Sequence, residues 1–330
     1  MGMGLMKICT VGNGLIMATL AGSHLYGTNT PESDIDIRGV CLQTRESLLG
    51  FQGFEQFQPK GENAIRFANE NFGYLSDDVC IYGVTKFLKL AMDCNPNIVE
   101  LLFAPAFYEN EIWHEIVKNS HNILSTKVKH SFSGYAFAQL KRIKRHKEWL
   151  DSAPEKPNPE EYDAVFVDGG WKWPDVNKNE ILKLVAVTAH FNLDKKLGAL
   201  FNRWSRKKEY QRAMDDYKSY QTWVKNRNPK RFVLEKKYGF DTKHAAHLVR
   251  LFAEASRLLT TGELVFPLPR AERELYLDVL HGAVDYDTIV KSAETYDVTL
   301  AQLAENSVLP KKPNRVAVEE MLMKINRGSL

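Results

Sequence analysis

The sequence predicts an α/β fold in the N-terminal third, with a small mixed sheet flanked by helices, and a mostly helical C-terminal domain. Short apolar or β-branched runs bounded by turn residues lie before residue 83, whereas helical spacing of apolar residues dominates afterwards. A chain of 330 residues is long enough for two domains. We therefore expect domains at 1–110 and 111–330, with the Pro- and Gly-rich stretch 151–179 as a linker or surface excursion.

Composition sets outer limits on the class of protein. No apolar run reaches the roughly 18 residues that a membrane helix needs, and the start of the chain lacks a signal-peptide pattern. The four cysteines form no Cys-x-x-Cys pair, which argues against a zinc site or a disulfide framework and favours a reducing cytoplasm. We expect a cytoplasmic protein without a membrane partner. The net charge of +3 does not by itself indicate a nucleic-acid binder.

The first predicted strand covers residues 16–21 and ends at Gly22 and Ser23. Gly22 has no Cβ, so a phosphate can approach the backbone closely. Ser23 offers a hydroxyl at the start of a short helical turn over 23–26, where free backbone N–H groups attract phosphate. Gly22 and Ser23 are therefore candidate phosphate-binding residues.

The second predicted strand carries Asp34 and Asp36 among β-branched residues. Side chains alternate along a strand, so the two carboxylates are expected on one face, where they repel each other unless a cation lies between them. Oxygen ligands suit magnesium. A lone Asp-x-Asp is more often a turn or a solvated edge, but the preceding Gly-Ser and the apolar flanks favour a metal site. Arg38 is expected on the opposite side of the sheet.

These residues resemble a known signature. Gly22-Ser23, followed eleven positions later by Asp34-Ile-Asp36, is similar to the nucleotidyltransferase signature of the DNA polymerase β superfamily. The longer stretch 22–40 is similar to the predicted nucleotidyltransferases of the RNA repair pathway, which accompany RNA ligases. The resemblance implies a polymerase-β-like core, two Mg²⁺ ions and an NTP substrate, ATP or another. It also implies transfer of NMP to a hydroxyl with release of pyrophosphate, and an RNA ligase as functional partner.

The resemblance also implies a third carboxylate on a neighbouring strand, which helps to deprotonate the attacking hydroxyl. Asp77 and Asp78 precede an apolar run that predicts a third core strand ending at Tyr82. Asp78 opens this strand directly and is the expected third metal ligand. Asp77 is the alternative, and a simple turn at the start of the strand is another.

The remaining elements follow from apolar spacing and turn residues. Residues 43–57 are expected to be loop-like, and residues 58–73, which contain Pro59, Gly61 and Gly73, to be rich in turns. Helices are expected where apolar residues recur at helical spacing, at 85–92, 96–103, 111–124, 131–150, 179–201, 270–281, 287–294 and 316–326.

Residues 203–237 form a basic segment. We count twelve Lys and Arg against four acidic residues, a net charge of +8, and aromatic residues are interleaved: Tyr210, Tyr217, Tyr220, Trp223 and Phe232 among them. This is the composition expected of a nucleic-acid groove. A solvated helix face gives a similar pattern, so both interpretations stay open.

A helix beginning at residue 241 or 242 places Lys243, His247 and Arg250 on one stripe. This stretch resembles an Asp-x-Lys-His-x-x-His-x-x-Arg-like helix of the RNA repair branch. Three cationic or titratable residues on one stripe would suit phosphate groups of the substrate or nucleotide. Buried hydrogen bonding between domains is the alternative.

Together the residues and the resemblance predict a metal-dependent nucleotidyltransferase that acts on an RNA end, tRNA-like or broken, during repair. Two alternatives remain. One is AMP transfer to a protein hydroxyl, as in antitoxin-type enzymes, which are typically much shorter. The other is a non-catalytic RNA-binding protein.

Overall fold

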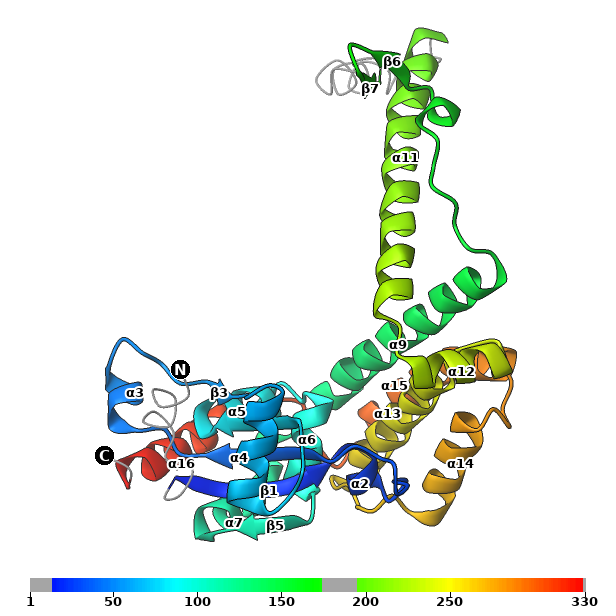
Figure 1. The fold of residues 1–330 in the computed structure, drawn as a ribbon. Helices are drawn as coiled ribbons and strands as arrows, with labels where there is room; N and C mark the ends of the chain where they lie inside the picture. The colour runs from blue at the N-terminus through cyan, green and yellow to red at the C-terminus, as the bar shows by residue number, and fades with distance from the viewer. Residues whose placement is uncertain (1–13, 174–194, 329–330) are drawn as a thin grey trace. The chain divides into compact units, whose positions relative to one another are not determined.

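The structure is a computed structural model that describes residues 14–173 and 195–328 (Figure 1). The chain divides into two compact units. Unit 1 comprises residues 1–143 and 242–330, and unit 2 comprises residues 144–241. The chain thus leaves unit 1 and later returns to it, and the expected boundary between residues 110 and 111 coincides with neither edge of unit 2.

Unit 1 contains a five-stranded sheet with the strand order β3-β4-β2-β1-β5. Strands β2 and β4 pair in parallel, and the other neighbouring pairs are antiparallel. The mixed sheet predicted from the sequence is therefore confirmed. The strands are β1 (Leu15–Ala21), β2 (Asp36–Cys41), β3 (Gln56–Phe57), β4 (Asp78–Gly83) and β5 (Ala106–Glu109).

The central strands are apolar because helices cover them. β1 reads LIMATLA and is buried along nearly all its length, as expected for a strand covered on both faces. Ile16, Met17, Ile37 and Ile81 are fully buried in the resulting core. This packing fixes the end of β1 and the starts of β2 and β4, where the predicted site residues lie.

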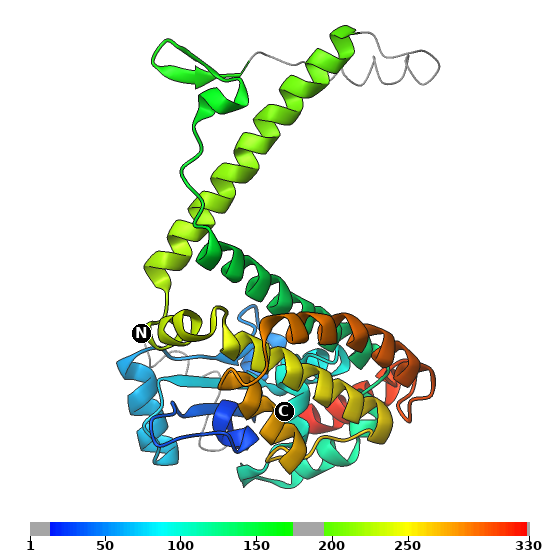
Figure 2. The same ribbon diagram turned by 90° about the vertical axis from the view of Figure 1, so that its right-hand side faces the viewer.

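The helices of unit 1 lie before and after unit 2 in the chain. Figure 2 shows α13 packed with α14 and α15, and the last helix, α16, returns to contact α5 and α8. The helices are α2 (Gly22–Tyr26), α3 (Arg45–Leu49), α4 (Glu62–Phe72), α5 (Val84–Met92), α6 (Pro96–Phe103), α7 (Glu111–Lys118), α8 (Ser120–Ile123), the first part of α9 (Lys127–Asp151), α13 (Thr242–Thr261), α14 (Arg270–Leu280), α15 (Tyr286–Glu305) and α16 (Arg315–Arg327).

The region 58–73 differs from the turn-rich stretch expected from its glycines. It contains the eleven-residue helix α4, which buries Ala64, Phe67 and Ala68 against the sheet. Gly61 and Gly73 have positive φ angles and stand at the two ends of this helix. The two glycines therefore mark the ends of a helix. The helical spacing of the apolar residues between them indicated this helix better than the turn residues did.

Unit 2 is built from helices and one small hairpin. Its elements are the end of α9, η1 (Pro159–Tyr162), β6 (Val165–Val167), β7 (Gly170–Lys172), α11 (Lys195–Asn226) and α12 (Pro229–Tyr238). The stretch expected to be a linker thus contains η1 and the β6–β7 hairpin. The helix predicted at 179–201 falls mostly outside the described residues, because only its last seven positions belong to α11.

Two further expectations concern membranes and cysteines. Among the described residues, no helix combines the length and apolar character needed to cross a bilayer. Cys80 and Cys94 are buried free thiols.

Candidate active site

The bend at Gly22 lies directly against the carboxylate of Asp36. In the β1–β2 pair Ala21 stands opposite Asp36, so the residue after Ala21 meets the first residue of β2. Gly22 has a φ angle of +61°, and a Cβ at this position would lie 2.5 Å from Asp36 Oδ2. Glycine is therefore required both by the backbone conformation and by the close approach of the carboxylate.

Ser23 follows in the first turn of the short helix α2. The N-cap residue of α2 is Ala21, which has no side-chain oxygen with which to cap this turn. The Ser23 side chain is partly exposed, and its carbonyl oxygen accepts a hydrogen bond from Thr28 N at 3.0 Å. The predicted phosphate-binding pair thus stands beside the aspartate strand.

The parallel pairing of β2 and β4 brings two carboxylates together at one end of the sheet. Asp36 is directly opposite Asp78, and each is the first residue of its strand. Asp34 lies two residues ahead of β2 and is exposed. Sequence positions 34, 36 and 78 therefore converge on the edge of the sheet that also carries Gly22.

The titration of Asp36 reflects this crowding. The pKa of Asp36 is raised to about 6, mainly by partial burial. Arg38 opposes the rise, whereas the negative charges of Asp78 and Asp34 and a side-chain hydrogen bond with Asp78 add to it. A carboxyl with these neighbours is destabilised as an anion. A divalent cation would relieve that cost.

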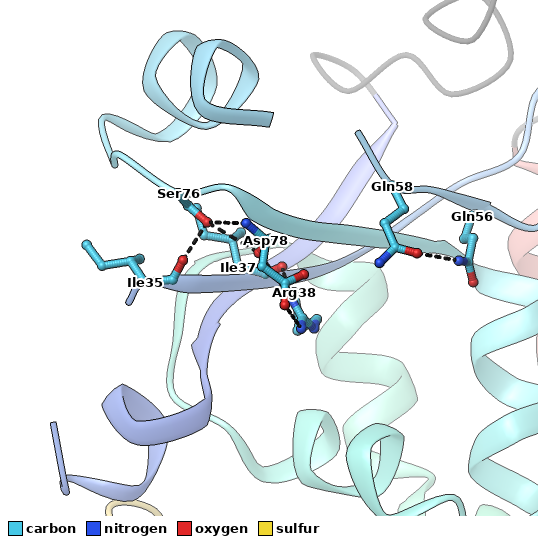
Figure 3. A network of polar contacts seen from close by, with 7 residues as sticks. All are labelled: Ile35, Ile37, Arg38, Gln56, Gln58, Ser76 and Asp78. Carbon is cyan, nitrogen blue, oxygen red and sulfur yellow. Dashed lines mark hydrogen bonds and ion pairs between the residues drawn. The ribbon is translucent and has the colours of Figure 1, made fainter. Parts of the chain in front are cut away.

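Arg38 lies on the same face as Asp36, contrary to the expectation that it would emerge on the opposite side. Its Nη2 donates to Asp78 Oδ2 at 2.9 Å, and its Nη1 donates to the Asp78 carbonyl oxygen at 3.0 Å (Figure 3). The expectation was wrong because residues 36 and 38 are two apart and so share a face of the strand. Arg38 therefore orients Asp78 and lowers the pKa of Asp36.

Asp77 and Asp78 have different surroundings. Asp77 is exposed and precedes β4, whereas Asp78 is paired with Asp36 across the sheet and held by Arg38. Ser76 holds the turn before them: its hydroxyl donates to the Ile35 carbonyl oxygen at 2.5 Å (Figure 3). The geometry favours Asp78 over Asp77 as the carboxylate that faces Asp36.

The predicted stripe on α13 divides into an exposed and a buried part. Lys243 is exposed and His247 is half-buried, whereas Arg250 is only 3% exposed. Arg250 Nη2 donates to His247 Nδ1 at 2.8 Å, and Nη1 forms ion pairs with Glu100 and Glu254. Arg250 thus takes part in the buried hydrogen bonding that was the alternative to phosphate contact.

The aromatic residues of the basic segment pack mainly within unit 2. Trp223 lies 5.4 Å from Trp149 and 5.9 Å from Tyr220, measured between ring centroids. The Arg227 guanidinium lies 4.1 Å from the centre of Trp223 and 4.2 Å from that of Phe232. These rings join the helices of unit 2, so exposed lysines of α11 are better placed than the rings to meet a nucleic acid.

The donor set fits a hard divalent cation. Asp34, Asp36 and Asp78 carry carboxylate oxygens near the starts of β2 and β4, and the raised pKa of Asp36 reflects its burial and its carboxylate neighbours, which Arg38 offsets only in part. Magnesium prefers such oxygen ligands and keeps positions for water and phosphate oxygens. The three aspartates are therefore the residues that would hold the metal.

A mixed sheet with a Gly-Ser turn beside paired carboxylates is the arrangement that the resemblance to nucleotidyltransferases of the DNA polymerase β superfamily implies. Residues 8–154 match the model of a narrower family, described as RlaP, the RNA repair pathway DNA polymerase beta family. This match confirms the resemblance predicted from the sequence for that part of the chain. The stretch 238–252 lies outside the matched residues, so its resemblance remains a prediction.

One curated relative extends over most of the chain. A protein of Enterobacteria phage T4, described as an uncharacterized 38.9 kDa protein in the nrdC–mobD intergenic region, is 24% identical over 302 residues. The aligned part covers 84% of this chain and 86% of the phage protein. No solved structure matches the chain significantly.

Proposed function

We propose that the protein is a metal-dependent nucleotidyltransferase that transfers NMP from an NTP to a hydroxyl at an RNA end during RNA repair. The observation that carries the proposal is the position of Gly22 against Asp36, with Asp78 opposite Asp36. A polyphosphate bound at the Gly-Ser bend would lie beside the carboxylates that hold its counterions.

Each residue has a distinct role in this proposal. Gly22 and Ser23 bind the outer phosphates through the backbone and the hydroxyl. Asp34 and Asp36 hold the ions that accompany the triphosphate, and Asp78 completes the set on the side of the attacking hydroxyl. Bound divalent ions would supply Lewis-acid activation of that hydroxyl and neutralise the departing pyrophosphate.

Other residues support this arrangement. Arg38 fixes the Asp78 carboxylate and keeps the pKa of Asp36 lower than burial alone would leave it. Lys243 is the exposed member of the α13 stripe. We propose that Lys243 and His247 contact phosphate. Arg250 is buried in ion pairs with Glu100 and Glu254, and we propose a structural role for it.

The RNA acceptor is proposed from the family match and from the charge of unit 2. The family description names RNA repair. Exposed basic residues of α11, Lys218 and Lys225 among them, provide a surface for the phosphate backbone. An RNA ligase that seals the extended or repaired end would be the functional partner.

Label transfer tests the proposal. Parent protein, Asp36→Asn and Asp77→Asn are incubated with each α-labelled NTP, Mg²⁺ and RNAs that differ in their termini. We expect label on RNA with the parent and with Asp77→Asn, and at least about a hundredfold less with Asp36→Asn. Label on protein instead of RNA would select the antitoxin-type activity. Equal transfer by Asp36→Asn and the parent would refute the assignment.

A further inference from the structure

Helix α2 carries the Gly-Ser bend at its first turn and a buried tyrosine at its last residue. Tyr26 is 8% exposed, and its hydroxyl donates to Glu100 Oε2 at 2.9 Å. Because α2 is only five residues long, the position of Tyr26 also fixes the position of Ser23, three residues earlier. Whatever holds Tyr26 therefore holds the proposed phosphate-binding turn.

Three charged residues from two other helices surround Tyr26. Glu100 of α6 and Glu254 of α13 both pair with Arg250 Nη1, the latter at 2.7 Å. The Arg250 guanidinium also lies 4.3 Å from the centre of the Tyr26 ring. We call Tyr26, Glu100, Arg250 and Glu254 the α2 clamp. All four are less than 9% exposed, so the interactions are screened little by solvent.

Burial is the main influence on the pKa values of the carboxyl of Glu254 and the hydroxyl of Tyr26 in the α2 clamp. The pKa of Glu254 is raised to about 8, mainly by burial, with Arg250 opposing the rise and the charge of Glu100 adding to it. Burial likewise holds the pKa of Tyr26 well above its usual range, so the hydroxyl remains a donor. Burial lowers the pKa of Arg250, but the nearby Glu100 and Glu254 more than offset this and hold it well above its usual range, so the guanidinium stays charged.

A second contact reinforces the clamp from the C-terminal part of the chain. Leu268 N donates to the Tyr26 carbonyl oxygen at 3.2 Å, and Leu268 shares a buried cluster with Leu25 and Tyr26. Gly27 has a φ angle of +69°, and a Cβ there would lie 2.9 Å from Pro267 Cβ. The end of α2 is thus packed tightly against the segment before α14.

We propose that Tyr26, Glu100 and Arg250 are positioning residues that hold α2, and with it Gly22 and Ser23, at the distance from Asp36 that NTP binding requires. This inference rests on the proposed function and adds the device that orders its phosphate-binding turn. Residues 242–330, which include α13 and its Arg250, belong to the same compact unit as the sheet and α2.

The test compares variants of the clamp with a matched control on the same helix. Tyr26→Phe removes the hydroxyl but keeps the ring over Arg250, and Arg250→Met removes the charge. Arg257→Met is the control, because Arg257 also lies on α13 but pairs with Glu272 of α14. Thermal unfolding of the full chain establishes that each variant is folded.

Two readouts separate the proposal from a general loss of stability. Amide exchange is followed at Thr28, whose N–H bonds to Ser23, and at Leu268, whose N–H bonds to Tyr26. We expect exchange at both amides to be about tenfold faster in the clamp variants, as for the loss of a hydrogen bond to a charged group, and unchanged in Arg257→Met. The KM for NTP is expected to rise by about tenfold, with kcat and the KM for RNA little changed.

The outcomes distinguish this inference from the function on which it rests. Unchanged exchange at Thr28 and Leu268 in both clamp variants would overturn the inference. Faster exchange with an unchanged KM for NTP would show that α2 is loosened without consequence, and would also overturn it. If the parent transfers no nucleotide, the proposed function fails and with it the role of the clamp in NTP binding, while the exchange data still decide whether the clamp orders α2.

Discussion

The metal-free protein should become more stable when Asp36 is replaced by asparagine, even though the replacement removes a proposed metal ligand. In the fold, burial and the charges of Asp78 and Asp34 raise the pKa of Asp36 from 3.8 to about 6. A carboxyl whose pKa is raised on folding adds stability while it is protonated, and this contribution is lost as pH rises through about 6. Asparagine does not ionise, so its contribution to stability does not fall as the pH rises.

The size of the effect follows from the pKa change. One pKa unit corresponds to about 1.4 kcal/mol, so the rise from 3.8 to about 6 sets an upper limit of about 3 kcal/mol. Asp36 is partly exposed and solvent screens its charged neighbours, so we expect Asp36→Asn to raise the free energy of unfolding by about 1–2 kcal/mol. We expect Asp36→Asn to melt roughly 2–4 °C above the parent at about pH 8, and at the parent's temperature below about pH 4.

Differential scanning calorimetry across this pH range, in chelator, measures the difference directly. Asp77→Asn is the control, because it removes an exposed carboxylate from the same turn and should show no such gain. Added Mg²⁺ should raise the melting temperature of the parent and leave Asp36→Asn unchanged. A variant that is less stable than the parent at about pH 8 would refute the argument that the carboxylates are crowded.

Three further changes have expected outcomes. Gly22→Ala should destabilise the protein by about 1–3 kcal/mol in denaturant unfolding, because of the positive φ angle and the clash with Asp36 Oδ2. Arg38→Gln should raise the pKa of Asp36 further above 6, because Arg38 opposes the rise, and should move the acid limb of Mg²⁺-dependent activity to higher pH. Lys218→Gln with Lys225→Gln should lower the slope of log affinity for single-stranded RNA against log salt by about 1.4, the value for two phosphate contacts.

Each of these expectations can fail in a definite way. Wild-type stability in Gly22→Ala would show that the bend and the carboxylate are farther apart than described. If the acid limb of the pH profile of Mg²⁺-dependent activity is unchanged in Arg38→Gln, Arg38 does not influence the pKa of Asp36 as proposed. An unchanged salt slope in the double lysine variant, with Lys311→Gln as control, would remove α11 from the proposed RNA surface.

The core of the fold could be predicted because its signals are local. The apolar run of β1, the β-branched run that begins around Asp36 and the apolar run after Asp78 each identify a strand without knowledge of the others. Their pairing places Gly22 and Asp36 in contact. The prediction that Arg38 lies on the opposite face was wrong, because side chains alternate along a strand and residues 36 and 38 therefore share a face.

Other features depend on contacts that sequence spacing does not reveal. Nothing local to Arg250 distinguishes a phosphate ligand from the partner of Glu100, which is 150 residues away in the chain. The basic segment likewise gave no indication that Trp223 would pack against Trp149 of another helix. The prediction of a turn-rich stretch at 58–73 was wrong, because Gly61 and Gly73 cap the two ends of helix α4.

The central claim is that the aspartates beside the Gly-Ser bend bind a divalent ion together with a polyphosphate. Titration calorimetry of Mn²⁺ and a non-hydrolysable NTP analogue into the parent, Asp36→Asn and Asp77→Asn measures this binding without any acceptor. The account predicts that the ion and the nucleotide bind cooperatively to the parent and to Asp77→Asn, and that this cooperativity is lost in Asp36→Asn. Equal, cooperative binding by Asp36→Asn would contradict it.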